Sequence, residues 1–223
     1  LMFLVIMFNF PMALAYSLFL LTRQRKKILP FAGLIIGSAL GLGIIYGLFF
    51  GKNSIKTLHI ETSHSNLPDS FNDYTIVHVS DFHIGSMLKS NKLLEKTRNE
   101  IRKTAPDLLL FTGDMVNNFA YETIEFESIL KQMASHSPAY SILGNHDYGD
   151  YTSWENAEDK KSNLEAIISG LNKSGFRLLR NENIVIKRAS DSIFLAGVEN
   201  WGHPPFPQYA RLEKAINGIP DSA

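Results

Sequence analysis

The chain has 223 residues, which is enough for one sizeable domain plus an accessory segment. It has no cysteine, which excludes disulfides, thiolate metal sites and a cysteine nucleophile. The formal net charge is zero, but residues 1–51 hold four basic and no acidic residues, which leaves 18 basic and 22 acidic residues in 52–223. Because the larger segment has no basic surplus, we expect no nucleic acid partner.

Two apolar runs open the chain. Residues 1–21 and 31–50 each approach the roughly 20 apolar residues that cross a bilayer. A buried helix of a soluble domain is the alternative for each run, but two uncharged runs in tandem favour a transmembrane helical hairpin over residues 1–51. The basic cluster Arg23–Lys27 lies between the runs, and positively charged loops stay on the cytoplasmic side. We therefore predict a multi-pass protein of the cell membrane, with residues 52–223 outside the cytoplasm.

The two ends of the sequence also carry an expectation. Leu1 already lies inside an apolar run, and the last residues carry no terminating signature. We therefore expect the chain to be truncated at both ends.

From residue 52 onward, strands and helices alternate. Short apolar or β-branched runs predict strands, and apolar residues spaced i, i+3, i+4, i+7 predict helices. The expected strands are 55–60, 74–79, 108–111, 139–143, 176–179, 184–188 and 193–198, and the expected helices are 90–103, 126–133, 164–171 and 208–216. The strand–helix–strand–helix–strand order predicts an α/β domain over residues 52–223 with parallel neighbouring strands.

Polar motifs follow three of the predicted strands. They are Asp81-Phe82-His83, Gly113-Asp114 and Gly144-Asn145-His146-Asp147. Each motif alone is most simply a turn or a helix cap, but the ligand site of a parallel sheet lies beyond the carboxyl ends of its strands, where all three motifs would meet. Their coincidence therefore favours a metal site.

The residue types in these motifs suit a particular group of metals. Asp81 and His83 could bind one ion together, Asp114 could bridge two ions through its two oxygens, and Asn145 offers a neutral carbonyl oxygen. Oxygen and imidazole ligands without sulfur favour Mn, Fe or Zn. Two such ions clamp a phosphoryl group and supply a hydroxide for in-line attack.

The last motif also offers two groups that need not bind metal. His146 could donate a proton to the leaving oxygen or hold the phosphoryl oxygens. Asp147 could orient and charge that imidazole, as a carboxylate behind a catalytic histidine does.

In this order, the three motifs resemble those of the calcineurin-like metallophosphoesterase superfamily, and the stretch from Val79 to Gly85 is similar to its membrane-anchored bacterial branch, which includes UDP-diacylglucosamine pyrophosphate hydrolases. The resemblance covers roughly Tyr74 to the C-terminus. It implies a two-sheet sandwich flanked by helices and a centre of two divalent metal ions.

Carried over residue by residue, the resemblance gives each motif a role. Asp81 and His83 would bind the first metal, and Asp114 would bridge the two metals. Asn145 would bind the second metal. His146 would be the catalytic or phosphate-binding histidine, with Asp147 as its partner.

The sequence departs from the family pattern after Asp147. The family requires a further histidine and a Gly-His-x-His motif, whereas the only later histidine is His203, which is followed by two prolines. The first metal would lack one ligand and the second would lack two, so we expect this chain alone to hydrolyse phosphoesters poorly or not at all.

Two functions follow from the sequence. The first is a membrane-anchored phosphohydrolase that cleaves a phosphomonoester, phosphodiester or pyrophosphate of a small molecule or lipid with a dinuclear-metal-activated hydroxide. The alternative is a non-catalytic, membrane-tethered binding module with a phosphoesterase-like fold and an incomplete metal site.

Overall fold

The computed structural model of the protein describes residues 2–21, 28–49, 54–87 and 90–220. The chain divides into two compact units, Leu1–Lys56 and Thr57–Ala223. Each unit is described by itself.

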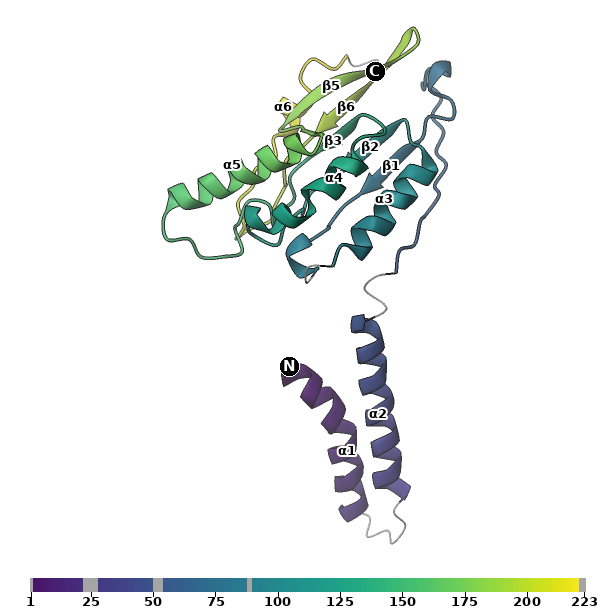
Figure 1. Cartoon of the computed structure of the whole chain (residues 1–223), viewed down its shortest axis with the longest axis vertical. Helices are drawn as coiled ribbons and strands as arrows, with labels where there is room; N and C mark the ends of the chain where they lie inside the picture. The colour runs from purple at the N-terminus through teal and green to yellow at the C-terminus, as the bar shows by residue number, and fades with distance from the viewer. Residues whose placement is uncertain (1, 22–27, 50–53, 88–89, 221–223) are drawn as a thin grey trace. The chain divides into compact units, whose positions relative to one another are not determined.

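The first unit contains two helices. Helix α1 (Met2–Leu21) and helix α2 (Ile28–Phe49) lie side by side (Figure 1). Among the residues that the structure describes, no helix is both long enough and apolar enough to cross a membrane. The structure therefore does not support the predicted transmembrane hairpin or a multi-pass arrangement. The basic cluster Arg23–Lys27, on which the predicted orientation depends, lies outside the described residues.

The second unit is built on a four-stranded parallel sheet. Its strands are β1 (Ile76–Val79), β2 (Leu108–Phe111), β3 (Ala139–Ser141) and β4 (Phe176–Leu178), and they lie in the order β1-β2-β3-β4. Val79 pairs with Phe111, and Phe111 pairs with Ser141, so the carboxyl ends of the first three strands are level. The predicted α/β class and parallel pairing are confirmed.

Three helices connect the strands of this sheet. They are α3 (Lys92–Thr104), α4 (Glu127–Met133), which the 3₁₀ helix Ala120–Phe126 precedes, and α5 (Ala157–Lys173). All three connections step in the same direction along the sheet, so right-handed crossovers place the helices on one face. Figure 1 shows α3 and α4 in front of the strands.

The core lies between the sheet and these helices. In β2, Leu108, Leu109 and Phe111 are at most 1% exposed, as expected for a strand that is covered on both faces. The helices contribute apolar residues at helical spacing, and the buried ones are Leu94, Ile101, Ile129, Leu130, Met133, Ile167 and Leu171. Full burial of each such side chain is worth about 1.5–3 kcal/mol, so this core holds the sheet edge in a fixed position.

The structure differs from the sequence expectation at two segments. Residues 55–60 form no strand, and Leu58 and Ile60 are 68% and 80% exposed, because this short apolar and β-branched segment has no partner strand. The last helix, α6 (Leu212–Ala215), is shorter than predicted. The segment before it is held by the carbonyl oxygen of Asn200, which accepts from the backbone N–H groups of Tyr209 and Ala210.

A second, two-stranded antiparallel sheet follows the parallel one. It consists of β5 (Glu182–Arg188) and β6 (Asp191–Gly197). Just after β6, the buried Glu199 carboxylate accepts hydrogen bonds from Tyr148 Oη at 3.0 Å, Arg180 Nε at 2.8 Å and Asn181 Nδ2 at 2.6 Å. Tyr148 directly follows the third polar motif, so Glu199 connects the second sheet to the loop that carries this motif.

Replacing Glu199 with alanine is expected to lower the free energy of unfolding by about 2 kcal/mol, because buried donors lose their acceptor. Urea denaturation measures this change. The control is Glu155→Ala, since the exposed Glu155 carboxylate makes no hydrogen bond or ion pair within the described part of the chain. An equal, small effect of both substitutions would contradict the connecting role of Glu199.

Candidate metal centre

The loops that follow β1 and β2 remain paired beyond the strands. The backbone N–H of Asp81 donates to Gly113 O, and that of His83 donates to Asp114 O, each at 3.0 Å. The N–H of Ile84 donates to Met115 O at 3.0 Å. These bonds hold the first two polar motifs next to each other at the carboxyl edge of the sheet.

Three of the predicted site residues have an unusual backbone conformation. Asp81, His83 and Asp114 have φ values of +56°, +44° and +58°, in the left-handed region. Side chains rarely adopt this region, and such residues cluster at functional sites. Here the conformation lets the two loops turn sharply at the strand ends.

The loop after β3 approaches the loop after β2 very closely. A Cβ atom on Gly113 would lie 2.0 Å from the backbone nitrogen of Gly144. A Cβ atom on Gly144 would lie 2.2 Å from Oδ1 of Asp114. Glycine at both positions therefore lets the second and third motifs meet.

Replacing Gly113 with alanine is expected to lower the free energy of unfolding by more than about 1 kcal/mol, because a side chain there combines a clash with a positive φ of +94°. The matched control is Gly218→Ala, because Gly218 has a φ of +83° but nothing within 4 Å of an added Cβ. Urea denaturation of both variants separates the clash from the backbone effect. A loss no larger for Gly113 than for Gly218 would count against the required close approach.

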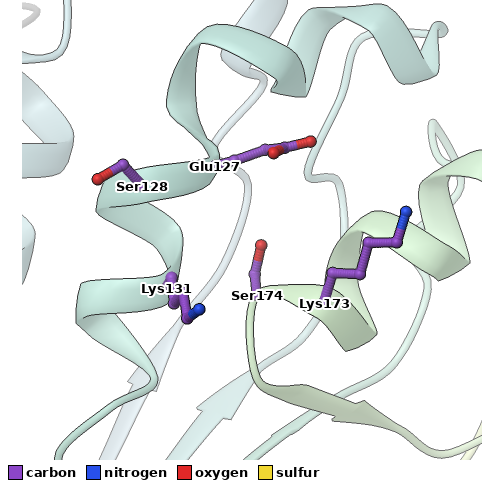
Figure 2. Close-up of a pocket in the computed structure, with 5 residues that line it drawn as sticks. All are labelled: Glu127, Ser128, Lys131, Lys173 and Ser174. Carbon is purple, nitrogen blue, oxygen red and sulfur yellow. The ribbon is translucent and has the colours of Figure 1, made fainter.

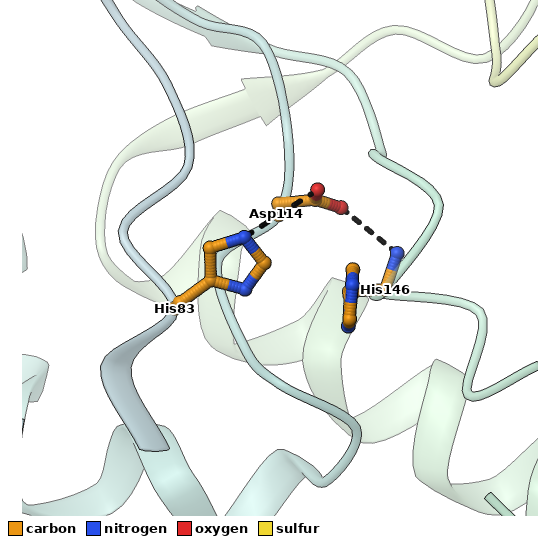
Figure 3. A group of neighbouring side chains, drawn as sticks. All are labelled: His83, Asp114 and His146. Atoms are coloured by element: carbon orange, nitrogen blue, oxygen red, sulfur yellow. Dashed lines mark hydrogen bonds and ion pairs between the residues drawn. The ribbon is translucent and has the colours of Figure 1, made fainter. Parts of the chain in front are cut away.

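His83, Asp114 and His146 form one group in which a ligand atom from each residue lies within 4.8 Å of the others (Figure 3). His83 Nε2 lies 3.7 Å from Asp114 Oδ2, and the backbone N–H of His146 donates to Asp114 Oδ1 at 2.8 Å. The two imidazole rings are perpendicular, with centroids 4.7 Å apart. One residue from each of the three motifs thus contributes to the group.

The other two predicted ligands lie beside this group. Asp81 Oδ1 is 3.9 Å from His83 Nε2, and the Asp81 side chain is largely exposed. Asn145 Nδ2 donates to the hydroxyl of Tyr151 at 2.8 Å. The sequence assigned His146 a role on the substrate, whereas the structure also places it among the potential ligands.

Asp147 is completely buried beneath the loops. Its carboxylate accepts backbone N–H bonds from Asp114, Met115 and Gly144 at 2.9–3.0 Å, and from Val116 at 3.3 Å. Burial raises the pKa of Asp147 to about 7, although the backbone donors favour the charged form. Through these hydrogen bonds, Asp147 holds the loop of the second motif next to the loop of the third.

The expected pairing of Asp147 with the His146 imidazole is not made in the described structure. Nδ1 of His146 instead lies 2.7 Å from the carbonyl oxygen of Asn117. Because a carbonyl can only accept, we assign the proton to Nδ1, which leaves Nε2 with a free lone pair in the neutral ring. Sequence could not reveal this contact, since it depends on a main-chain oxygen.

The sequence profile of the family described as Calcineurin-like phosphoesterase matches residues 74–211. The chain belongs to the calcineurin-like phosphoesterases. This confirms the resemblance inferred from the three motifs, all of which lie inside the matched segment.

Individual relatives agree with this family. Proteins named "transmembrane protein with metallophosphoesterase domain" from Danio rerio and Bos taurus are 27% identical over 180 residues and 29% identical over 188, in each case 78% of this chain and 38% of the relative. UDP-2,3-diacylglucosamine pyrophosphatase LpxG of Chlamydia trachomatis is 35% identical over 92 residues, 40% of this chain and 28% of the relative. The chain thus spans less than half the length of these relatives. No solved structure matches it.

Calcineurin-like phosphoesterases use divalent metals, and the residues of this chain fit that requirement. Imidazole nitrogen and carboxylate oxygen are ligands for Mn, Fe and Zn, and here they converge from three rigidly held loops. Together with the lone pair assigned to Nε2 of His146, this arrangement offers nitrogen and oxygen donors to a cation at this edge of the sheet.

A surface pocket of about 510 Å³ lies between α4 and the C-terminal end of α5 (Figure 2). Its lining residues are Glu127, Ser128, Lys131, Lys173 and Ser174. It shares no residue with the group in Figure 3. The glutamate beside the two lysines partly offsets their charge, so this pocket supplies no argument for an anion site.

Proposed function

We propose that the unit at residues 57–223 is a metal-dependent phosphohydrolase whose reaction takes place at the carboxyl edge of the parallel sheet. The observation that carries this proposal is the convergence of His83, Asp114 and His146, with ligand atoms within 4.8 Å of one another. Family membership supports the same reaction class.

Within this proposal, Asp81 and His83 would hold the first divalent ion, Asp114 would contribute to both ions, and Asn145 would hold the second. When bound, such ions would activate water for attack and would neutralise charge on the phosphoryl group. The 3.7–3.9 Å separations of His83 Nε2 from the two aspartates leave room for coordination of one cation between them.

His146 acts on the phosphoryl group in this scheme. Its Nδ1–H bond to Asn117 O fixes the ring orientation, and when Nε2 is also protonated it can donate that proton to the leaving oxygen or hold a phosphoryl oxygen by a hydrogen bond. Asp147 does not act on the imidazole; it keeps the backbone of Asp114 and the third motif in register through its buried carboxylate.

The substrate class is also a proposal. A phosphomonoester, phosphodiester or pyrophosphate fits a centre that binds phosphoryl oxygens. The Chlamydia trachomatis relative is named UDP-2,3-diacylglucosamine pyrophosphatase. This name favours a lipid pyrophosphate as the substrate of the present chain.

Attachment to a membrane is a further part of the proposal. Phe10, Phe31 and Leu42 in the first unit are 63–66% exposed, and two relatives are named as transmembrane proteins. Large exposed apolar side chains favour contact with an apolar surface. Flotation of the chain with phospholipid vesicles tests this: we expect co-flotation, and recovery of all the protein in the vesicle-free fraction would contradict attachment.

Binding of Mn²⁺ followed by binding of inorganic phosphate tests the proposed centre. We expect the chain to bind Mn²⁺ in calorimetry, and we expect phosphate to bind only after Mn²⁺ is present. Any hydrolysis of a nitrophenyl phosphodiester should require Mn²⁺, because the proposed reaction depends on a bound divalent ion. Phosphate binding without any metal requirement would overturn the proposal.

The non-catalytic binding module is the second candidate. It has the same fold and the same group of three potential ligands, so the two candidates differ only in whether the bound phosphoryl group is turned over. Mn²⁺ and phosphate binding with no measurable Mn²⁺-dependent hydrolysis, even over long incubation, would favour this candidate.

A further inference from the structure

Tyr151 contacts two residues of the proposed centre at once. Its hydroxyl accepts a hydrogen bond from Asn145 Nδ2 at 2.8 Å. Its ring stacks on the His146 imidazole, with centroids 4.5 Å apart and an angle of 18° between the planes. No other side chain in the described structure makes a hydrogen bond or ring contact with both the Asn145 amide and the His146 ring. Tyr151 is 43% exposed, so its burial alone does not explain this placement.

The hydrogen bond to Tyr151 holds the Nδ2 end of the Asn145 amide and leaves its Oδ1 end free. An amide nitrogen carries two hydrogens and no lone pair for a metal, so only Oδ1 can serve as a ligand. When Nδ2 donates to the tyrosine hydroxyl, Oδ1 points away from Tyr151. A neutral amide without such a partner could rotate and present its nitrogen.

The stacked ring restricts His146 in a complementary way. Nδ1 of His146 is held by Asn117 O at 2.7 Å, which fixes one edge of the imidazole. The aromatic ring of Tyr151 covers one face, and the edge-to-face contact with His83 adds a second aromatic neighbour. Phe206 lies beside Tyr151, with ring centroids 5.0 Å apart, and supports its position.

We propose that Tyr151 is a positioning residue that holds the Asn145 amide with its carbonyl oxygen free for a metal ion and holds the His146 imidazole in place. This inference rests on the proposed function, because that function makes Asn145 a metal ligand. Residues that orient a ligand from behind typically change metal affinity by about 10–100-fold when they are replaced.

The first experiment measures Mn²⁺ affinity by calorimetry on the chain and three variants. Tyr151→Phe removes the hydroxyl but retains the stacked ring, and we expect about tenfold weaker Mn²⁺ binding. In an Asn145→Ala background, the same substitution is expected to change the affinity less than about twofold, because the hydroxyl then has nothing to orient. Equal losses in both backgrounds would overturn the inference.

The matched control is Tyr121→Phe. Tyr121 is 66% exposed, and its hydroxyl makes no hydrogen bond among the described residues. We expect unchanged Mn²⁺ affinity and an unchanged melting temperature. A loss of affinity in this control equal to that of Tyr151→Phe would show that removal of any nearby hydroxyl has the same effect, and would contradict the specific role of Tyr151.

A second experiment needs no metal. In NMR spectra, Tyr151→Phe should shift the Asn145 side-chain amide resonances and leave the His146 ring protons nearly unchanged. Tyr151→Leu should move both, because the ring current over His146 is lost. Unchanged Asn145 resonances in Tyr151→Phe would overturn the positioning role. If the spectra change as expected but the wild-type chain binds no Mn²⁺, the proposed function fails and the ligand role of Asn145 fails with it.

Discussion

Replacing Asp114 with asparagine is expected to weaken Mn²⁺ binding by more than about 100-fold, which is the upper limit reported for residues that only support a ligand. Asp114 is the central member of the candidate centre: one carboxylate oxygen faces His83 Nε2 at 3.7 Å and the other accepts from the His146 backbone at 2.8 Å. Asparagine retains the size and one acceptor oxygen but removes the negative charge. Calorimetric titration with Mn²⁺ measures the change.

An unchanged melting temperature and a control substitution would show that the effect of Asp114→Asn is specific to metal binding. The melting temperature should change little, since the amide oxygen can still accept from the His146 N–H. The control is Glu155→Gln, which removes an equal charge from an exposed position without recorded partners in the described chain. Mn²⁺ affinity that is unchanged in Asp114→Asn would show that the group of three is not a metal centre.

Replacing Asp147 with alanine is expected to lower the free energy of unfolding by about 3–4 kcal/mol, one of the largest effects that a single substitution in this chain should have. The carboxylate is the acceptor for backbone N–H groups of Asp114, Met115, Val116 and Gly144, and all of these groups lose their partner together. A buried N–H without an acceptor retains the full cost of leaving water. Urea denaturation measures the difference.

A second Asp147 variant distinguishes lost hydrogen bonds from lost volume. Asp147→Asn has the same size, but its amide nitrogen would face backbone donors, so we expect a loss of about 2 kcal/mol. Glu155→Ala, at an exposed position, should have almost no effect. If Asp147→Asn proved as stable as the wild-type chain, the backbone donors would not be what makes Asp147 necessary.

The sheet and its helices were predictable because each depends on a strong local pattern. The uninterrupted run Leu108–Phe111 predicted a strand covered on both faces, and it forms β2 with neighbours on both sides. The helical spacing of Ile129, Leu130 and Met133 likewise predicted α4, whose apolar face is buried. Residues 55–60 were wrongly predicted as a strand, because residue types that favour strands do not show whether a partner strand exists.

The candidate site was predictable in its composition but not in its internal contacts. Asp81, His83, Asp114 and Asn145 were found because they follow strands whose ends meet, and their metal-binding roles stay predictions. The partner of His146 was not predictable, since Nδ1 pairs with the main-chain oxygen of Asn117. Contacts to backbone atoms depend on how loops pass one another, and one sequence carries no direct signal for this.

Asp81, His83 and Asp114 have left-handed backbone conformations, which lower the local stability at the same positions that supply potential metal ligands. Each such residue costs about 1 kcal/mol or more relative to a residue that tolerates positive φ. Glycine would relieve that cost at each position and would remove the potential ligand at the same time. A carboxylate and an imidazole at these strained positions therefore combine a local cost in stability with side chains that a metal site could use, which is a stability–function trade-off.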